Sequence, residues 1–458
     1  MSAQRFEPSG ALSGSLTPPP DKSISHRAAL LGAMATGESR ITGYLDSADT
    51  RSTLAAVDAL GASVASSSGA NGSLDVEVQG IGLDGPAKSA GADPLEIDVG
   101  NAGTLMRLLP GWLAGQPEGG WRLDGDESIR HRPVDRIAGP LREMGGEIEC
   151  RDGRLPPLEM RGAQLRGIAY EMPVASAQVK SCVLLAGLMA EGTTTVIERD
   201  PSRDHTERML RAAGARLSTA PEGSGLMLEG RLPGKRVSIE RIDGLKPCGF
   251  SVPGDFSSAA FFIVAALIVP GSRIRLEGVG LNPTRVGLLG IINRMGARIE
   301  VEEDPPLGGE PRGAISVRHS HLKRTSVGAG EVPVAIDELP LVGLAAAFAE
   351  GETVVRGAAE LRHKESDRVA TVVEALNTLG GDVEAFDDGF AVRGTGGLRG
   401  GVVSSHGDHR LSMMGAIAGL ASRDGVEVDG MDAAGVSYPG FEADLASLLT
   451  HNSARELD

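Results

Sequence analysis

The hydrophobic positions of this chain gather in helix-length segments that recur at regular intervals. The first segment, 26–34, is rich in alanine and leucine. Similar segments follow at 103–114, 178–190, 257–269, 338–349 and 410–421. Their starting positions are spaced by roughly 72–81 residues, which is too long for a solenoid repeat. The pattern predicts a unit of about 76 residues that occurs six times and fills the chain.

Each predicted unit continues with the same elements. A short β-rich run follows a glycine, as at 193–197 and 352–355. A second amphipathic helix then ends at a glycine, the residue that most easily adopts the left-handed conformation past a helix C-terminus. These second helices are expected at 54–60, 137–144, 209–213, 288–295 and 369–379. A strand, a polar turn and another strand complete the unit, as at 215–229.

The two ends of the chain predict how the units divide into domains. The sixth unit ends on its second helix at 441–449 and has no hairpin, while the stretch up to about residue 20 is left over. We expect that stretch to supply strands to the last-formed domain. A division into three units and three units gives a continuous domain, 21–252, and a discontinuous domain, 1–20 plus 253–458. Three serial domains of two units each remain the alternative.

Charge and composition exclude several classes of function. The chain has 458 residues, 45 basic and 61 acidic, for a net charge of −16, and no basic tail, which argues against nucleic-acid and anionic membrane surfaces. Arg5, Glu7 and Pro8 stand where a signal peptide would be apolar, and no apolar run approaches the ~20 residues of a spanning helix. Three cysteines without a CxxC pair suggest neither a disulfide framework nor a zinc site. A cytoplasmic protein is expected.

Motifs for common cofactors are missing from the sequence. It contains no GxxxxGK[ST], no GxGxxG after a strand and no HExxH. His406 and His409, or His319 and His321, have spacings that could hold a metal, but neither pair has a clear third ligand. These absences argue against nucleoside triphosphate, dinucleotide and zincin sites, and we expect no metal at either histidine pair.

Cations and hydroxyl groups gather where the first helix of a unit begins. Helix N-termini favour anions, and capping explains serines and acidic residues there. It does not explain Lys22, Arg27 or Arg410. In a protein of net charge −16, cations at equivalent places in a repeat predict a site for a multiply anionic small molecule. Further basic clusters lie in the connections at 130–132, 202–205 and 362–368.

These segments resemble the motifs of the 5-enolpyruvylshikimate-3-phosphate (EPSP) synthase family from about residue 14 to residue 441. The matching segments are DKSISHRAA (21–29), GNAGTLMR (100–107), ASAQVKSCVLLAGL (175–188), SRDHTE (202–207), IDELP (336–340), RHKESDR (362–368) and GDHR (407–410). Three of them, ASAQVKS, SRDHTE and KESDR, resemble the family's second class, which is known for glyphosate-tolerant members.

The resemblance implies an α/β fold of two domains, each made of three βαβαββ units around a pseudo-threefold axis, with the active site in the interdomain cleft. The implied reaction transfers the enolpyruvyl group of phosphoenolpyruvate to the 5-hydroxyl of shikimate 3-phosphate. It proceeds through a tetrahedral intermediate and releases phosphate, in the shikimate pathway to chorismate and the aromatic amino acids. No metal or organic cofactor is implied, and we expect a monomer.

The resemblance also implies roles for individual residues. Asp337 is expected to be the general base for the 5-hydroxyl and the acid or base of the elimination step. Glu365 and Lys22 are candidates to handle the proton of the methylene carbon. Because neighbouring cations lower the pKa of a carboxyl group, a donor role for Glu365 would need compensating burial. The expected ligands of shikimate 3-phosphate are Lys22, Ser23, Arg27, Ser176, Ala177, Gln178, Arg203, Asp337 and Lys364. Those of phosphoenolpyruvate are Lys22, Gly103, Arg132, Gln178, Arg368 and Arg410.

One segment departs from the family, and two rival functions are disfavoured. Residues 434–439 lack the lysine that many members place over phosphoenolpyruvate. UDP-N-acetylglucosamine enolpyruvyl transferases typically have Lys-Asn where Lys22-Ser23 stands and a cysteine in the loop corresponding to 112–132, and neither is present. A non-catalytic repeat scaffold would not need Lys, Arg and Asp at equivalent helix starts.

Gly103 gives the resemblance a testable consequence. Tolerant members of the second class carry alanine at this position of the GNAGT motif, whereas a glycine leaves room for the inhibitor. We therefore expect ordinary glyphosate sensitivity, measured as inhibition of phosphate release from the two substrates. An inhibition curve that stays flat at millimolar glyphosate would contradict this expectation.

Overall fold

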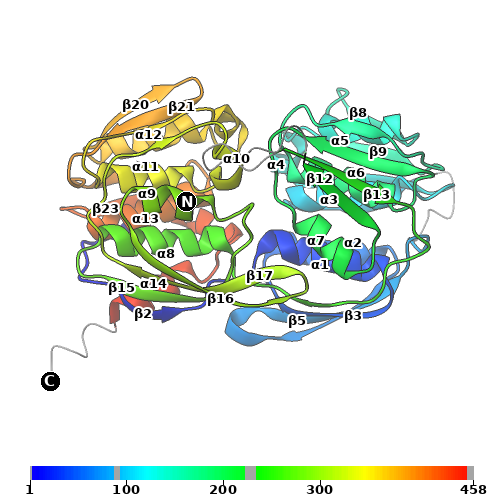
Figure 1. Ribbon diagram of the computed structural model, residues 1–458, viewed down its shortest axis with the longest axis horizontal. Coiled ribbons are helices and arrows are strands. Elements are labelled where there is room, and N and C mark those ends of the chain that lie inside the picture. The colour runs from blue at the N-terminus through cyan, green and yellow to red at the C-terminus, as the bar shows by residue number, and fades with distance from the viewer. Residues whose placement is uncertain (1–2, 87–92, 222–233, 451–458) are drawn as a thin grey trace. The chain divides into compact units, whose positions relative to one another are not determined.

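The computed structural model describes residues 3–86, 93–221 and 234–450. The chain forms two compact units (Figure 1). Unit 1 comprises Met1–Pro19, Pro253–Pro305 and Pro311–Asp458, and unit 2 comprises Pro20–Val252 and Pro306–Glu310. This division differs from the expected one in two places: Pro20 and residues 306–310 belong to unit 2, whereas both were expected in the discontinuous domain. Within unit 2, Glu310 Oε1 lies 3.0 Å from Nδ1 of His205.

Unit 2 repeats one arrangement of strands and helices. In its described part the strand orders are β14-β3-β5-β4, β6-β7-β9-β8 and β10-β11-β13-β12. In each sheet the first strand is parallel to the second, and the remaining pairs are antiparallel. The strands are β3 (Thr36–Tyr44), β4 (Ser63–Ser68), β5 (Leu74–Ile81), β6 (Leu95–Asp98), β7 (Gly120–Asp124), β8 (Glu147–Arg151), β9 (Leu155–Arg161), β10 (Ala169–Glu171), β11 (Thr193–Glu198), β12 (Leu217–Pro221), β13 (Lys235–Glu240) and β14 (Gly249–Ser251). The helices are α1 (Lys22–Met34), α2 (Ala48–Ala59), α3 (Gly103–Leu113), α4 (Glu127–Arg130), α5 (Asp135–Glu143), α6 (Ala177–Gly187) and α7 (His205–Ala212).

Unit 1 has the same arrangement with one shorter sheet. In its described part the strand orders are β16-β17-β15-β2, β18-β19-β21-β20 and β1-β23-β22. The strands are β1 (Ala3–Phe6), β2 (Ser13–Leu16), β15 (Arg273–Gly280), β16 (Arg298–Leu307), β17 (Glu310–Arg318), β18 (Ser326–Val327), β19 (Glu352–Val355), β20 (Asp382–Phe386), β21 (Gly389–Arg393), β22 (Gly401–Ser404) and β23 (Val426–Asp429). The helices are α8 (Phe256–Ile268), α9 (Gly287–Arg294), α10 (Val332–Ala335), α11 (Leu339–Ala347), α12 (Arg368–Thr378), α13 (His409–Ala421) and α14 (Phe441–Thr450).

The stretch left over at the N-terminus completes two sheets of unit 1. Strand β2 runs parallel to β15, and β1 runs antiparallel to β23, where the sixth repeat has no hairpin of its own. Unit 2 closes in a similar way, because β14 near its end pairs with β3 near its beginning. The chain therefore cannot divide into serial domains of two units, since each closing strand is distant in sequence from its partner.

The structure adds a short strand before the first helix of each repeat. The hydrophobic pattern predicts a unit that starts at the helix, whereas strands such as β6, β10 and β18 precede the helices, as the βαβαββ resemblance implied. Strands of two to four residues are too short to show the alternation that identifies a strand in a sequence.

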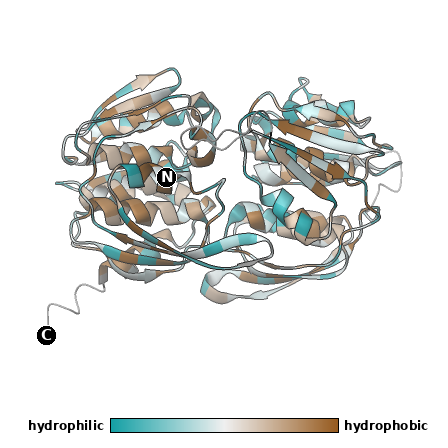
Figure 2. Ribbon diagram, viewed as in Figure 1, coloured by the Kyte–Doolittle hydropathy of each residue, from teal (hydrophilic) through white to brown (hydrophobic). Residues whose placement is uncertain are grey.

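The central helices are buried on all sides rather than along one stripe. Every residue of α8 is buried, and the helix coincides within one residue with the apolar segment at 257–269. Each unit has its own hydrophobic core around such helices. Figure 2 shows more hydrophobic colour on the helices inside the units than on the acidic strand β16. The polar residues at the starts of these helices are consequently held on a rigid support.

The glycine after α9 tests the predicted helix ends. Gly296 has φ +91°, and a Cβ added there would lie 3.6 Å from the backbone oxygen of His321, so backbone strain is the main penalty of a side chain. Gly296→Ala should lower the free energy of unfolding by about 1 kcal/mol. In the same helix Gly290 is exposed and has open space around an added Cβ. Gly290→Ala should therefore raise the free energy of unfolding by up to ~1 kcal/mol. Urea unfolding of both variants measures the two changes in the free energy of unfolding. Changes of the same sign would contradict the prediction.

Candidate active site

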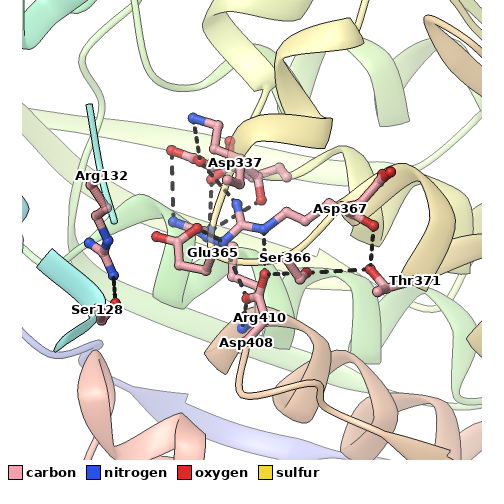
Figure 3. Close-up of polar contacts among 12 residues, drawn as sticks. Ser128, Arg132, Asp337, Glu365, Ser366, Asp367, Thr371, Asp408 and Arg410 are labelled. Carbon is pink, nitrogen blue, oxygen red and sulfur yellow. Dashed lines mark hydrogen bonds and ion pairs between the residues drawn. The ribbon is translucent and has the colours of Figure 1, made fainter. Parts of the chain in front are cut away.

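In unit 1 the carboxylate of Asp337 faces several cationic side chains. Asp337 lies between α10 and α11, and its side chain is 11% exposed. Its oxygens lie 3.6 Å from Arg285 Nη1, 3.7 Å from Lys364 Nζ, 3.4 Å from Arg368 Nη1 and 3.8 Å from Arg410 Nη2. Arg410 Nη1 also donates to the backbone oxygen of Asp337 at 3.2 Å. Figure 3 shows nitrogen atoms gathered around this carboxylate.

Arg368 links several carboxylates of this cluster. It begins α12, is 1% exposed, and its Nε donates to Asp408 Oδ2 at 2.8 Å. Its Nη2 donates to Glu365 Oε2 at 2.7 Å, and its Nη1 is the group that faces Asp337. Ser366 Oγ also donates to Asp408 Oδ2 at 3.0 Å (Figure 3). The guanidinium predicted to hold phosphoenolpyruvate thus faces protein carboxylates here.

Opposing effects set the charges of the acids in this cluster. Burial would raise the pKa of Glu365, but the Arg368 guanidinium, His409 and Lys364 outweigh it and hold that pKa well below its usual range. Burial also opposes ionisation of Asp408, and Arg368 nevertheless keeps its pKa low. Both groups are therefore carboxylates at neutral pH, and Glu365 is suited to accept a proton rather than to donate one.

Glu338 differs from its neighbours. It is 1% exposed, and burial raises its pKa, which the nearby Asp337 raises further while the guanidinium groups of Arg285 and Arg410 only partly offset the effect. Its carboxyl group accepts a hydrogen bond from Ser257 Oγ at the start of α8. A second acid, less readily ionised, therefore lies beside Asp337.

The sequence motifs did not identify all members of this cluster. Arg285 is 4% exposed and contacts Asp255 Oδ1 at 3.2 Å and Glu338 Oε1 at 3.7 Å, in addition to Asp337. Asp255 is the N-cap of α8, where its Oδ1 accepts from the backbone N of Ser257. The sequence alone could not identify this arginine in the loop after β15 as a site residue, because an isolated Arg is usually on the surface. Its buried acidic partners are known only from the structure.

In unit 2 the start of α1 places the predicted residues close together. Lys22 Nζ lies 3.1 Å from Asp49 Oδ2, and its side chain is 25% exposed. Arg27 is buried and donates from Nη1 to the backbone oxygen of Ser23 at 2.8 Å and from Nε to Thr206 Oγ1 at 2.7 Å. Burial lowers the pKa of Arg27 to about 10, so the guanidinium is still charged at neutral pH.

The start of α3 brings two arginines to a residue without a side chain. Arg107 Nη1 donates to the backbone oxygen of Gly103 at 3.0 Å, and Arg132 Nη2 donates to Ser128 Oγ at 2.9 Å and to Asn101 Oδ1 at 3.2 Å. Figure 3 shows the Ser128 contact. A Cβ at position 103 would lie 3.1 Å from the Nη1 atom of each arginine. The absence of a side chain at Gly103 therefore lets both cations approach this helix start.

The start of α6 carries the remaining predicted residues of unit 2, apart from Arg203. Ser176 is the N-cap and accepts from the backbone N of Val179 at 3.4 Å, and Ala177 is the first helical residue. Gln178 Nε2 donates to Thr104 Oγ1 on α3 at 3.3 Å. Arg203 lies in the loop before α7 and is partly exposed. Most of the predicted residues of unit 2 thus lie at helix starts.

Features typical of metal and membrane proteins are missing from the described part of the chain. Within residues 3–86, 93–221 and 234–450, no group of three or more His, Cys, Asp or Glu side chains has a geometry that could hold a metal ion. In the same part of the chain no helix is both long and apolar enough to span a membrane. His319 and His321, considered above as a metal pair, stack edge to face with ring centroids 5.5 Å apart.

Comparison with known proteins assigns the chain to a family. A sequence model of the EPSP synthase (3-phosphoshikimate 1-carboxyvinyltransferase) family matches residues 6–445. A 3-phosphoshikimate 1-carboxyvinyltransferase of Thermus thermophilus is 47% identical over 450 residues, which cover 98% of this chain and 99% of the relative. The chain belongs to the EPSP synthase family. The enzyme of the same name from Shouchella clausii is 46% identical over 438 residues, 95% of this chain and 96% of the relative.

Solved structures agree with the EPSP synthase assignment. The EPSP synthase of Acinetobacter baumannii matches with a TM-score of 0.84 and 40% identity, over 97% of this chain and 98% of that one. The enolpyruvyl transferase NikO from Streptomyces tendae matches with a TM-score of 0.75 at 17% identity, over 97% of this chain and 96% of that one, which shows a common fold alone. The expected family and the α/β enolpyruvyl transferase fold class are confirmed.

The lowered pKa values in unit 1 predict how stability depends on pH. A carboxyl group whose pKa is lower in the folded than in the unfolded state stabilises the fold above its unfolded pKa of about 4, and the contribution is lost as pH falls below it. Asp408→Asn should lower the free energy of unfolding by about 2 kcal/mol at pH 6 and should lose less additional stability than the wild type between pH 6 and 3. Urea unfolding at both pH values measures this.

Asp58→Asn is the matched control, because Asp58 is an exposed carboxylate on α2. It should change neither the stability at pH 6 nor the loss on acidification. Equal pH dependence of the wild type and the Asp408→Asn variant would contradict the role assigned to Arg368.

Proposed function

We propose that this chain is a 3-phosphoshikimate 1-carboxyvinyltransferase, which joins the 5-hydroxyl oxygen of shikimate 3-phosphate to C2 of phosphoenolpyruvate and releases phosphate. The observation that carries the proposal is the Asp337 carboxylate held among Arg285, Lys364, Arg368 and Arg410. A carboxylate among cations stays ionised and can accept a hydroxyl proton, while the same cations favour anionic substrates. Family membership supplies the identity of those substrates.

The residues of unit 2 supply ligands for shikimate 3-phosphate. The proposed ligands there are Lys22, Ser23, Arg27, Ser176, Ala177, Gln178 and Arg203, and Asp337 and Lys364 of unit 1 complete the set. Lysine, arginine and hydroxyl groups at helix starts suit a phosphate, because charge-assisted hydrogen bonds add to the helix dipole. The 25% exposed Lys22 can exchange its contact with Asp49 for a substrate oxygen.

The proposed ligands of phosphoenolpyruvate combine guanidinium groups with a bare backbone. Arg132, Arg410 and Arg368 present forks that match carboxylate and phosphate groups. Gly103 lets a substrate oxygen approach the start of α3, and Lys22 and Gln178 join the set. Because Arg368 is 1% exposed and faces protein carboxylates, Arg410, whose side chain is 13% exposed, is the more accessible of the two arginines in unit 1.

The proposed reaction has an addition and an elimination step. In the addition, Asp337 takes the proton of the 5-hydroxyl, and the hydroxyl oxygen bonds to C2 of phosphoenolpyruvate. C3 of phosphoenolpyruvate gains a proton and becomes a methyl group. In the elimination, the methyl group loses a proton, the double bond returns, and the C2–O bond to phosphate breaks. Because its low pKa keeps Glu365 ionised, Glu365 is the proposed acceptor of the methyl proton, and the Lys22 ammonium is then the proposed donor in the addition.

The working form is proposed to be a cytoplasmic monomer. Among the described residues the exposed large hydrophobic side chains are Val174, Val301, Val402 and Val436, which lie in separate segments and form no continuous apolar run in sequence. The three cysteines are all free thiols, as suits a reducing compartment.

Substitution of Asp337 tests the proposed base. Asp337→Ala should reduce turnover by roughly 10²–10⁴-fold, because it removes the proposed acceptor of the hydroxyl proton, while the other proposed ligands keep most of the binding of shikimate 3-phosphate. Phosphate release from shikimate 3-phosphate and phosphoenolpyruvate measures turnover, and calorimetry measures binding. Asp382→Ala, which removes an exposed carboxylate on β20, should leave both unchanged. Near-normal turnover of the Asp337→Ala variant would refute the assignment.

A further inference from the structure

A cluster of buried charged side chains lies between α6, α7 and β11 of unit 2. Lys180 on α6 is 0% exposed, and its Nζ lies 2.9 Å from Glu198 Oε2, 2.7 Å from Glu207 Oε1 and 3.3 Å from the backbone oxygen of Ser202. Glu198 Oε2 and the Ser202 backbone oxygen accept hydrogen bonds from this ammonium group, and Glu207 forms an ion pair with it. The Glu198 and Glu207 side chains are 0% and 2% exposed, so the contacts are shielded from water.

Lys235 on β13 completes the charge balance. Its Nζ lies 3.3 Å from Glu207 Oε1 and 3.8 Å from Glu198 Oε2. Burial opposes the charge of Lys180, but Glu207 and Glu198 raise its pKa, and burial likewise opposes ionisation of Glu207, whose pKa Lys180 and Lys235 lower. Two cations therefore face two anions. We call Lys180, Glu198, Glu207 and Lys235 the Lys180 cluster.

The Lys180 cluster holds the loop that carries a proposed substrate ligand. Glu198 Oε1 accepts hydrogen bonds from the backbone N of Ser202, at 2.9 Å, and from its hydroxyl group. Lys180 binds the backbone oxygen of the same serine. Ser202 is thus fixed at three atoms, and Arg203 is the next residue in the chain.

Lys180 and Glu207 are also next in sequence to two residues that bind the Arg27 side chain. Ser181 follows Lys180 on α6, Thr206 precedes Glu207 on α7, and their hydroxyl oxygens are 2.6 Å apart. Arg27 donates to Thr206 Oγ1 at 2.7 Å and to Ser181 Oγ at 3.1 Å. The guanidinium therefore bridges α6 and α7 at the place where the ion pair joins them.

We infer that the Lys180 cluster positions Arg27 and Arg203 for shikimate 3-phosphate, with Lys180 and Glu207 as positioning residues that do not touch the substrate. The inference rests on the proposed function. A buried ion pair is often no more stabilising than apolar residues of the same size, so stability alone is a weak reason for placing four charges here. Their connection to both arginines through Ser202, Ser181 and Thr206 supplies a different reason, because a small displacement of a ligand is costly for binding.

Substitution of Glu207 tests this inference. Glu207→Gln keeps the size of the side chain and removes the charge that Lys180 faces. The Kd and KM of shikimate 3-phosphate should rise about tenfold, while kcat and the KM of phosphoenolpyruvate at saturating shikimate 3-phosphate change less than about twofold. Calorimetry and phosphate release measure these quantities, and circular dichroism establishes that the variant is folded.

Further variants separate positioning from folding. The double variant Lys180→Met/Glu207→Gln removes one charge of each sign and should raise the Kd of shikimate 3-phosphate at least as much as Glu207→Gln. Lys235→Met removes the member of the cluster that is 16% exposed, so this variant should disturb folding least. It should raise the Kd of shikimate 3-phosphate about threefold. The control Thr195→Val removes the Thr195–Ser238 hydrogen bond between β11 and β13 and should leave the Kd unchanged.

An unchanged Kd in the folded variants, or a fall in kcat without a rise in KM, would overturn the inference. Wild-type protein that fails to bind shikimate 3-phosphate would instead overturn the proposed function.

Discussion

Ion pairing between buried carboxylates and buried cations is the interaction on which the candidate site depends. Transfer of an unpaired charge from water into the protein interior costs several kcal/mol. Asp408 and Glu198 are both 0% exposed, and each is within 3 Å of a cationic nitrogen, at 2.8 Å from Arg368 and 2.9 Å from Lys180. Each pair fixes the position of its members, because neither partner can leave without exposing the other to that cost.

The helix starts connect these ion pairs to the fold. Asp255 and Asp408 accept hydrogen bonds from the backbone N–H groups that begin α8 and α13, and the same side chains bind Arg285 and Arg368. A capping carboxylate has little freedom, since the helix itself orients it. In unit 1 the repeat therefore uses the same capping arrangement twice to place an acid and its arginine at the start of a deeply buried helix.

Local patterns explain why much of this could be predicted from the sequence. The apolar segments gave α8 and α13 nearly residue for residue, because buried helices need continuous apolar sequence. The motifs named Asp337, Lys364, Glu365, Arg368 and Arg410, and the structure brings all of them into one cluster. Short strands such as β18 were not found, because two residues show no periodicity.

Local sequence patterns are enough to predict the repeat, the helices and the family motifs, and hence the chemistry to look for. Which charged residue faces which depends on the tertiary structure: Arg368 and Asp408 are 40 residues apart, and Arg27 and Thr206 are 179 apart. It also showed Arg285 and Lys180 to be buried, although the sequence marked neither as a site residue. The physical reason is that hydrophobic periodicity and capping act over a few residues, whereas the partner of a buried charge is chosen by the packing of distant segments.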